Sequence, residues 1–356
     1  MSAEPIEILK WNSEYSVHVA EIDREHQFLF GLVNRFHEAM LAGKGTEILR
    51  TLLAELTKYT IDHFANEEKL MAAVKYPEMQ THIRLHEKLQ LRVSEVEARF
   101  RRGETAITIE LMLFLSDWLK NHVMVTDRQL GDYVELEKNF TAYLDRLLQG
   151  DLRGCGLVIQ RLLTEGISFK DLYVNLFQRS LYRTGELWMR NLVSVATEHL
   201  ATSITQSMMT LVHPTLLDSP RNGKKAVVTC VGGELHQVGA QMVSDTFECL
   251  GWESYFLGAN TPVEGLLDLI GEKRPDVLCL SVSLTSHIGL FNDTVKRARA
   301  RFPDLEILAG GQALRPGRFE IASDPHLRYL QSLDELERWI TNTHGKDSCW
   351  IVPLAS

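Results

Sequence analysis

"HFANEEKLM", at residues 63–71, places a histidine and a glutamate four residues apart. On an α-helix this spacing is about one turn, so His63 and Glu67 lie on the same face. Two interpretations of this pair are open. It is either part of a solvated, salt-bridged helix face or half of a metal site. The rest of the chain has to decide between them.

The bulk composition limits the class of protein. The chain has 356 residues, enough for two or three domains, and its 45% hydrophobic and 24% charged residues are typical of globular proteins. A net charge of -9 and a pI of about 5.8 argue against direct nucleic-acid binding. Nowhere do 18 uncharged apolar residues follow one another, and the start has no leader pattern. We therefore expect a cytoplasmic protein without a membrane partner.

The first part of the chain has the periodicity of helices. Apolar residues recur at three- and four-residue intervals, and short polar or proline-containing breaks separate the periodic segments. Long helices joined by short connections predict an antiparallel four-helix bundle. The predicted helical segments are 26–41, 48–64, 81–100 and 108–125.

In the remainder of the chain the sequence pattern changes twice. Residues 141–217 continue as a second, smaller helical bundle, and a turn-rich linker follows at 214–225. Four strand-like segments then alternate with helical ones, which is typical of a Rossmann-like, doubly wound parallel sheet. The expected fold is multidomain, α plus α/β. The expected domains are 1–138 (four-helix bundle), 139–218 (helical cap), 219–340 (Rossmann-like sheet) and 341–356 (C-terminal tail).

Further histidines strengthen the metal interpretation of the opening stretch. His82 and His86 repeat the four-residue spacing on the next predicted helix, so two chelating pairs can converge in the core of the bundle. His122 and Asp127 lie five residues apart, and a regular helix would point them about 140° from one another, so a local distortion is required. A set rich in imidazole suits iron better than magnesium or calcium. The candidate metal ligands are His26, His63, Glu67, His82, His86, His122 and Asp127.

Over residues 11–135 the sequence resembles the bacteriohemerythrins, in "WNSEYSVHVAEIDREH", "HFANEE", "HIRLH" and "HVMVTD". This resemblance implies two non-haem iron ions joined by an oxo or hydroxo group, and it implies dioxygen as the ligand. One iron would be held by His82, His86 and His122. The other would be held by His26 and His63 and would keep an open position for dioxygen. Glu67 and Asp127 would bridge the two irons.

A second candidate site lies at the end of the first predicted strand. "GGELHQVG", at 232–239, places His236 in the loop where ligands of such sheets bind, with Glu234 able to hold its ring and Gly239 permitting close approach of the following helix. Later strands end in small and hydroxyl residues. These are Ser281, Ser283, Thr285, Gly310 and Gly311. His287, after the hydroxyl cluster, is predicted to be solvated or a packing residue.

Residues 225–335 resemble cobalamin-binding domains on these motifs. The resemblance implies His236 as the lower cobalt ligand, with the nucleotide tail passing the hydroxyl strand and Gly310–Gly311. Upstream, Trp188 is followed after nine residues by Glu198 and His199, which resembles the W-x9-E-H cap over adenosylcobalamin in light-responsive regulators. Many of these have a histidine after the tryptophan, where this chain has Met189.

The favoured function is a sensor that combines an oxygen- or redox-responsive di-iron site with a light-responsive adenosylcobalamin module. No output segment is visible, so signalling requires an unknown downstream protein or a change in a homo-oligomer. One alternative is a redox enzyme in which the two metal centres cooperate, although an imidazole-rich iron shell favours oxygen binding over catalysis. Another alternative is a corrinoid or oxygen carrier without signalling.

Overall fold

The computed structural model describes residues 8–44, 46–102, 109–216, 219–315 and 324–344. The chain divides into two compact units, Met1–Lys138 and Asn139–Ser356, and each is described by itself. No helix in the described ranges is both long and apolar enough to cross a membrane.

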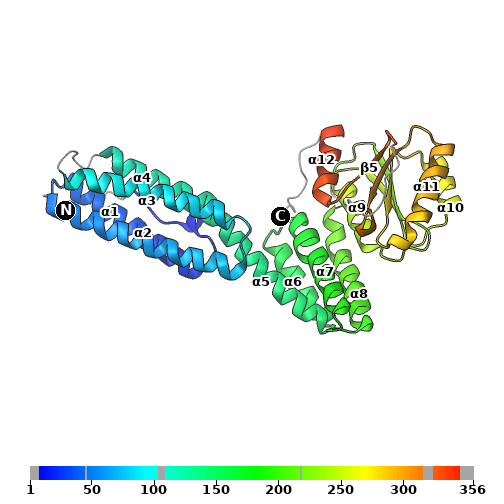
Figure 1. Ribbon diagram of the computed structural model, residues 1–356, viewed down its shortest axis with the longest axis horizontal. Helices are drawn as coiled ribbons and strands as arrows, with labels where there is room; N and C mark the ends of the chain where they lie inside the picture. Colours follow the sequence, from blue (N-terminus) through cyan, green and yellow to red (C-terminus); the bar gives the residue numbers. More distant parts are fainter. Residues whose placement is uncertain (1–7, 45, 103–108, 217–218, 316–323, 345–356) are drawn as a thin grey trace. The chain divides into compact units, whose positions relative to one another are not determined.

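The first unit is a bundle of long helices (Figure 1). Apolar residues of each helix meet in one core that contains Leu29, Phe36, Leu56, Phe64 and Leu119. The expectation of four helices in this part is confirmed. The fourth is interrupted by a π-helix and continues as α5, which runs through residue 138 without a break. The elements are η1 (Ser13–Tyr15), α1 (Ala20–Leu41), α2 (Thr46–Val74), α3 (Met79–Arg101), α4 (Ile109–Asn121), η2 (His122–Asp127) and α5 (Arg128–Leu148).

The second unit begins with helices that pack on a sheet. Tyr173 and Phe177 of the helical part share one core with Phe247 and Trp252 of the sheet part, so the two parts fold together. This agrees with the predicted second helical bundle. The elements after α5 are α6 (Leu152–Thr164), the π-helix η3 (Asp171–Gln178), α7 (Arg179–Met189), α8 (Val195–Val212) and η4 (His213–Leu216).

The sheet is parallel, with strand order β2-β1-β3-β4-β5. The doubly wound prediction is confirmed, but β5 was missed because three residues are too few to show strand periodicity. The elements are β1 (Lys225–Cys230), α9 (Val238–Cys249), β2 (Glu253–Gly258), α10 (Val263–Lys273), β3 (Val277–Ser281), η5 (Thr285–His287), α11 (Ile288–Arg301), β4 (Glu306–Gly310), η6 (Gln312–Leu314), β5 (Leu327–Tyr329) and α12 (Leu333–His344). The expected C-terminal tail starts inside α12, and its residues 345–356 lie outside the described ranges.

Alternation along the strands builds two separate cores. In β1, Val228 and Cys230 face the core shared with α9, α12 and the helical part, whereas Val227 faces the core formed with α10 and α11. Figure 1 shows helices on both sides of the sheet. In the sheet, β2 lies on one side of β1 and β3 lies on its other side. The loops after β1 and β3 therefore diverge, and in sheets of this kind ligands bind at the carboxyl ends of the strands where this happens.

A buried carboxyl group joins the helical part to α9. The hydroxyl of Tyr173 donates to Oδ2 of Asp245 at 2.8 Å, and Nε2 of His213 lies 4.0 Å from Oδ1. Burial, with a smaller contribution from the charge of Glu248, raises the pKa of Asp245 to about 6. The hydrogen bond from Tyr173 and the charge of His213 act in the opposite direction. This carboxyl group is therefore more easily protonated in the folded protein than in the unfolded chain.

We expect this carboxyl group to make stability depend on pH. The folded state holds the proton of Asp245 more tightly than the unfolded chain does. The stabilisation that this gives to the folded state is therefore complete below about pH 4 and is lost as pH rises through about 6, which lowers the free energy of unfolding by roughly 2–3 kcal/mol. Asp245→Asn keeps an acceptor for Tyr173 and cannot ionise. Denaturant unfolding of both proteins from pH 4 to 7 measures this, and the variant should gain stability over the wild type as pH rises. A constant difference between the two would contradict the prediction.

Candidate metal centre and cofactor site

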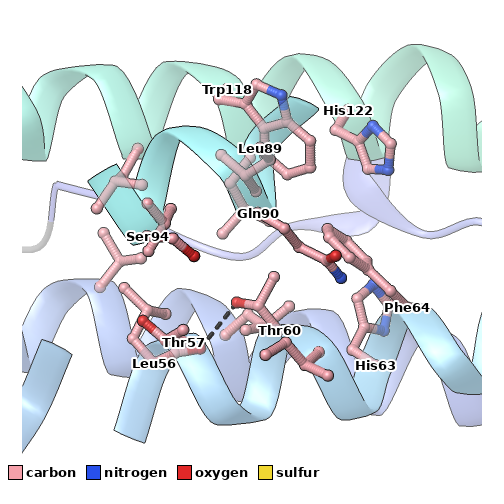
Figure 2. Close-up of a pocket in the computed structure, with 16 residues that line it drawn as sticks. Leu56, Thr57, Thr60, His63, Phe64, Leu89, Gln90, Ser94, Trp118 and His122 are labelled. Carbon is pink, nitrogen blue, oxygen red and sulfur yellow. Dashed lines mark hydrogen bonds between the residues drawn. The ribbon is translucent and has the colours of Figure 1, made fainter. Parts of the chain in front are cut away.

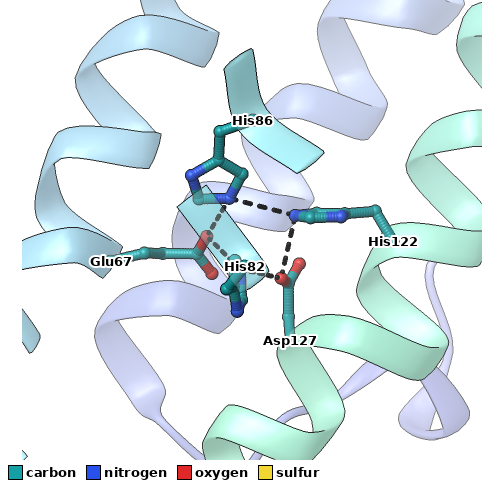
Figure 3. Close-up of side chains that lie close together, drawn as sticks. All are labelled: Glu67, His82, His86, His122 and Asp127. Atoms are coloured by element: carbon teal, nitrogen blue, oxygen red, sulfur yellow. Dashed lines mark hydrogen bonds and ion pairs between the residues drawn. The ribbon is translucent and has the colours of Figure 1, made fainter. Parts of the chain in front are cut away.

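Four helical segments bring the seven predicted metal ligands of the first unit together. Each of these side chains is at most 5% exposed, although all are polar. Their ligand atoms form two groups, and within each group the atoms lie within 4.8 Å of one another. The first group is Glu67, His82, His86, His122 and Asp127, drawn in Figure 3, and the second is His26, His63, Glu67 and Asp127. The two carboxylates belong to both groups.

The orientation of Asp127 separates the two groups. Its Oδ1 lies 3.2 Å from Nε2 of His82 and 3.1 Å from Nε2 of His122, whereas its Oδ2 lies 3.1 Å from Nε2 of His26. Each oxygen thus faces a different set of histidines, which is the arrangement of a bridging carboxylate. Glu67 is less clearly divided, because its Oε2 faces both His86, at 3.3 Å, and His63, at 3.7 Å.

The π-helix η2 supplies the local distortion that the five-residue spacing requires. It spans His122–Asp127, the two residues that a regular helix would point apart. A π-helical turn contains more residues than an α-helical one, so positions i and i+5 return to nearly the same face. Single π-helical turns inside α-helices are often found at functional sites. Here the extra residue brings Asp127 onto the face of His122.

Several buried polar atoms of this cluster have no hydrogen-bond partner. Nε2 of His26 and His82 and all four oxygens of Glu67 and Asp127 make no hydrogen bond, despite complete burial. Such atoms are costly unless a cation satisfies them. Nε2 of His86 also faces Nε2 of His122 at 3.1 Å, so two lone-pair-bearing nitrogens converge on one region. The donor set therefore fits a pair of metal ions.

The electrostatics of the cluster agree with this fit. Burial and the charge of Asp127 act to raise the pKa of Glu67. The surrounding histidines act more strongly in the opposite direction and lower this pKa to about 2. Burial lowers the pKa of His122 to about 4, so this imidazole is neutral and able to bind a metal at pH 7. Although burial also favours neutral His82, the two carboxylates raise its pKa to about 9. A positive charge is thus favoured inside the cluster.

Outer groups orient the histidine rings. Nδ1 of His63 lies 2.8 Å from Oε2 of Glu25, whose Oε1 accepts from the Asn66 amide at 2.7 Å. Nδ1 of His86 lies 3.4 Å from Glu68. A carboxylate on the outer nitrogen fixes the ring and makes the inner nitrogen a better ligand. Glu25 was not among the residues predicted from the sequence, although its position next to His26 places it near the site.

An apolar cavity of about 50 Å³ extends from the histidines along α2, α3 and α4 (Figure 2). The rings of His63 and His122 both line it, and these residues belong to the two different ligand groups. Phe64 stacks on His86 with ring centroids 3.7 Å apart, and Trp118 stacks on His122 at 4.3 Å. Aromatic rings therefore hold the histidines and form the inner end of the cavity.

In the second unit, Glu234 connects the loops that follow β1 and β3. This fully buried carboxylate accepts from Nδ1 of His236 at 2.5 Å through Oε1. Its Oε2 accepts from the backbone N–H groups of Ser283 and Leu284, at 2.8 and 3.0 Å, and from Nδ1 of His287, at 3.1 Å. Burial opposes ionisation, but these donors lower the pKa of Glu234 to about 2. His236 is thereby held by Nδ1, with Nε2 left for a ligand.

One expectation for this site needs correction, and another stays a prediction. His287 is not simply solvated or packed, because it is bound to the same carboxylate as His236 and its side chain is only 18% exposed. The space beside Gly239 is open, since nothing lies within 4 Å of a Cβ built on it, so the expected role of this glycine beside a bound cofactor stays a prediction. The sequence could not show either result, because both depend on which loops meet at the end of the sheet.

The small residues at the ends of β3 and β4 lie side by side. Ser281 is the register partner of Gly310, and Cys230 of β1 is the partner of Ser281 on its other side. Gly311 has φ 113°, and a Cβ there would lie 2.1 Å from the Val282 carbonyl oxygen, so only glycine fits. Ser283 is half-buried and Thr285 is exposed at the start of η5.

The predicted cap residues lie at the adjoining ends of α7 and α8. Trp188 is 46% exposed near the end of α7, and Met189 follows it. Glu198 is in the first turn of α8, and Nε2 of His199 lies 3.5 Å from its Oε2. Among the described residues, no hydrogen bond, ion pair or ring contact joins these side chains to the His236 loop. The structure places the cap residues near the end of α7 and the start of α8, with Trp188, Met189 and His199 exposed.

Family models match three segments of the chain. Residues 17–134 match the hemerythrin HHE cation binding domain, and residues 140–212 and 224–327 match two B12 binding domain models. A hemerythrin domain implies a di-iron centre, and B12 binding domains imply cobalamin. The chain therefore combines an iron- and oxygen-binding class of domain with a cobalamin-binding class.

The chain belongs to the hemerythrin family. It is 33% identical over 132 residues to a bacteriohemerythrin of Stenotrophomonas maltophilia, covering 37% of this chain and 85% of that protein. It is 35% identical over 126 residues to a bacteriohemerythrin of Pseudomonas aeruginosa, covering 35% of this chain and 81% of that protein. The monomethylamine corrinoid protein of Methanosarcina barkeri shares the fold, with a TM-score of 0.52 at 13% identity, over 58% of this chain and 98% of that one.

Proposed function

We propose that the protein is a sensor in which a dioxygen- or redox-responsive di-iron centre is joined to a light-responsive adenosylcobalamin module. Residues 1–138 would carry the iron centre, 139–218 the cap and 219–340 the cobalamin site. The observation that carries the proposal is the combination of seven buried side chains that could hold metal ions with an exposed Trp188 and a Glu198–His199 pair on the helices before the sheet.

In the iron centre, His82, His86 and His122 would hold one ion, and His26 and His63 the other. Glu67 and Asp127 would bridge the two ions. The orientation of Asp127 supports this role, because its two oxygens face different groups of histidines. The ion with two histidines has the smaller ligand set and so keeps an open position. The cavity beside His63 supports dioxygen as the ligand, because a small apolar gas partitions into an apolar cavity.

In the sheet domain, His236 would bind cobalt through Nε2, since Glu234 holds Nδ1. Leu235 of this loop, Leu284 of the loop after β3 and Leu290, which lies beside Gly233, are large apolar side chains that are 71%, 44% and 48% exposed. Exposed apolar groups beside a ligating histidine support a large, flat, largely apolar cofactor such as a corrin ring. Ser281, Ser283, Thr285 and Gly310–Gly311 would line the path of its nucleotide tail.

The bound adenosylcobalamin would supply a photolabile cobalt–carbon bond. Trp188 would cover the adenosyl group, and Glu198 and His199 would hydrogen-bond to it. If illumination released that group, Trp188 would lose the surface that the group would offer it, and the packing of α7 against α8 would be free to change. Any output then requires a partner protein or a homo-oligomer whose contacts depend on the cap.

Ligand preference in the dark and absorption under green light test this proposal. The dark protein should bind adenosylcobalamin more tightly than methyl- or hydroxocobalamin, and Trp188→Ala should erode the preference by about tenfold, the value of roughly one aromatic contact. Tyr182→Ala, another exposed aromatic residue of α7, is the matched control. Equal affinities, or a spectrum unaltered by light, would instead favour a carrier or an enzyme.

Met189 adds a second test of the cap. A thioether is a poor ligand for Co(III), so Met189 does not provide the imidazole that a histidine at this position would offer. After illumination the upper position on cobalt should hold either water, which would exchange readily with added cyanide, or the imidazole of His199. His199→Ala separates these outcomes, because only a His199 ligand would resist exchange and be lost in the variant.

A further inference from the structure

Three buried hydroxyl groups in the helical part of the second unit have no hydrogen-bond partner among the described residues. They belong to Tyr143 of α5, Ser180 of α7 and Thr205 of α8, and all three side chains are completely buried. Buried polar atoms in folded proteins are nearly always paired, either with protein groups or with ordered water. Phenylalanine, alanine and valine would fill the same places without an unpaired polar atom, so packing alone does not explain these hydroxyls. We call the three residues the hydroxyl layer.

The hydroxyls of Tyr143 and Thr205 are close enough to act on each other. Burial raises the pKa of Tyr143, and the Thr205 hydroxyl acts on this pKa in the opposite direction. Neither hydroxyl makes a direct hydrogen bond with a described residue. Two polar groups that are near each other but not directly bonded form the arrangement that a bridging water fits.

Ser180 lies at the same height of the helical part as the other two hydroxyls. It is nine residues before the end of α7, and Thr205 is ten residues after the start of α8. Because α7 packs against α8 and a short turn joins them, the two residues are at similar distances from that turn. Ser180 also follows Phe177 by about one turn, and the ring of Phe177 lies 5.8 Å from that of Tyr143. The π-helix η3 ends two residues before Ser180, and such segments are often found at functional sites.

The chemistry of the hydroxyl layer selects a neutral polar ligand. Its three side chains are neutral and offer both hydrogen-bond donors and acceptors. Cys155 of α6, which acts on Tyr143, is also neutral at pH 7, because burial and the charge of Asp151 raise its pKa to about 11. Such a set offers no charge to a metal ion or an anion. An internal water typically makes about three hydrogen bonds to buried polar groups, which equals the number of unpaired hydroxyls in the layer.

We propose that the hydroxyl layer is a binding site for one internal water molecule, which exchanges hydrogen bonds with α5, α7 and α8. This site is independent of the iron and cobalamin centres. Ser180 lies about two turns before Trp188 on α7, and Thr205 lies about two turns after Glu198 on α8. The water therefore holds the two helices that carry the cap residues in one register.

Calorimetric unfolding of the full-length protein tests the site by the sign of the change in melting temperature. Tyr143→Phe, Ser180→Ala and Thr205→Val each remove one hydrogen bond to the water and should lower the melting temperature by about 2–4 °C. In a layer without water, each substitution removes an unpaired hydroxyl instead. The melting temperature would then stay the same or rise, and this result would overturn the proposal.

Magnetic relaxation dispersion of water counts the long-lived internal waters directly. The double variant Tyr143→Phe/Thr205→Val removes two of the three partners and should hold one water fewer than the wild type. Thr184→Val is the matched control, because Thr184 is also completely buried on α7 but its hydroxyl donates to the carbonyl of Ser180 at 2.8 Å. This control should hold as many waters as the wild type, and a loss there would overturn the assignment to the hydroxyl layer.

An unchanged count in the double variant would overturn the proposal even if the melting temperatures fell, since the hydroxyls would then be bonded to protein groups. If Tyr143→Phe/Thr205→Val does not fold, Ser180→Ala/Thr205→Val takes its place, because both of its changes reduce or keep side-chain volume. The measurements require neither iron nor cobalamin. Their outcome is therefore separate from that of the proposed function.

Discussion

Glu67→Ala is expected to lose both irons, whereas the wild type should carry about two per chain with charge-transfer bands in the near ultraviolet. Glu67 is completely buried and belongs to both ligand groups, so its loss removes a ligand from each ion. It also removes one of the two negative charges that balance the metal charge in the cluster. The remaining histidines would then have Asp127 alone as their carboxylate partner.

Metal analysis and the ultraviolet spectrum of the purified variant measure this loss. Glu68→Ala is the matched control, because Glu68 is the next residue, is 37% exposed and lies 3.4 Å from the outer nitrogen of His86. It should retain the irons, at most with a weaker affinity. Thermal unfolding adds a second readout, since a ligand that binds only the folded state stabilises it. Retention of both irons in Glu67→Ala would show that Glu67 is not a bridge.

His236→Ala is expected to weaken cobalamin binding by on the order of a hundredfold and to shift the visible spectrum to that of a form without imidazole coordination. The physical reason is the geometry of Glu234, which holds Nδ1 of His236 at 2.5 Å and leaves Nε2 as the one available ring nitrogen. The spectrum of the iron centre should not change, because His236 and the iron ligands belong to different units.

Chemical rescue distinguishes a ligand from a structural residue here. Free imidazole can occupy the space left by the deleted side chain and should restore the spectrum of His236→Ala. His326→Ala, which alters a half-exposed histidine of the same domain, is the control and should bind cobalamin normally. If His236→Ala kept the wild-type spectrum, His287 would be the next candidate, because Glu234 holds it through Nδ1 in the same way.

Helical periodicity in the sequence was sufficient to define the candidate ligand pairs of the first unit. His63 with Glu67 and His82 with His86 are each four residues apart, and that spacing fixes a common face wherever a helix forms. The sequence also showed the alternation of strands and helices that defines the sheet, because buried parallel strands are short, apolar runs. For these features local structure determines the relative placement of the side chains.

The remaining features depend on contacts between segments far apart in the chain, which local patterns do not encode. Glu25 meets His63 across two helices, and Glu234 meets His287 across two loops. The three-residue β5 forms only because β4 offers an edge to pair with. Asp127 points toward both ligand groups because a π-helix spans His122–Asp127. Such a turn is rare, and here it forms within the packed bundle that contains the other members of the cluster. The sequence thus determined which residues could bind metal, and tertiary packing decided which outer groups hold them and which cavity they face.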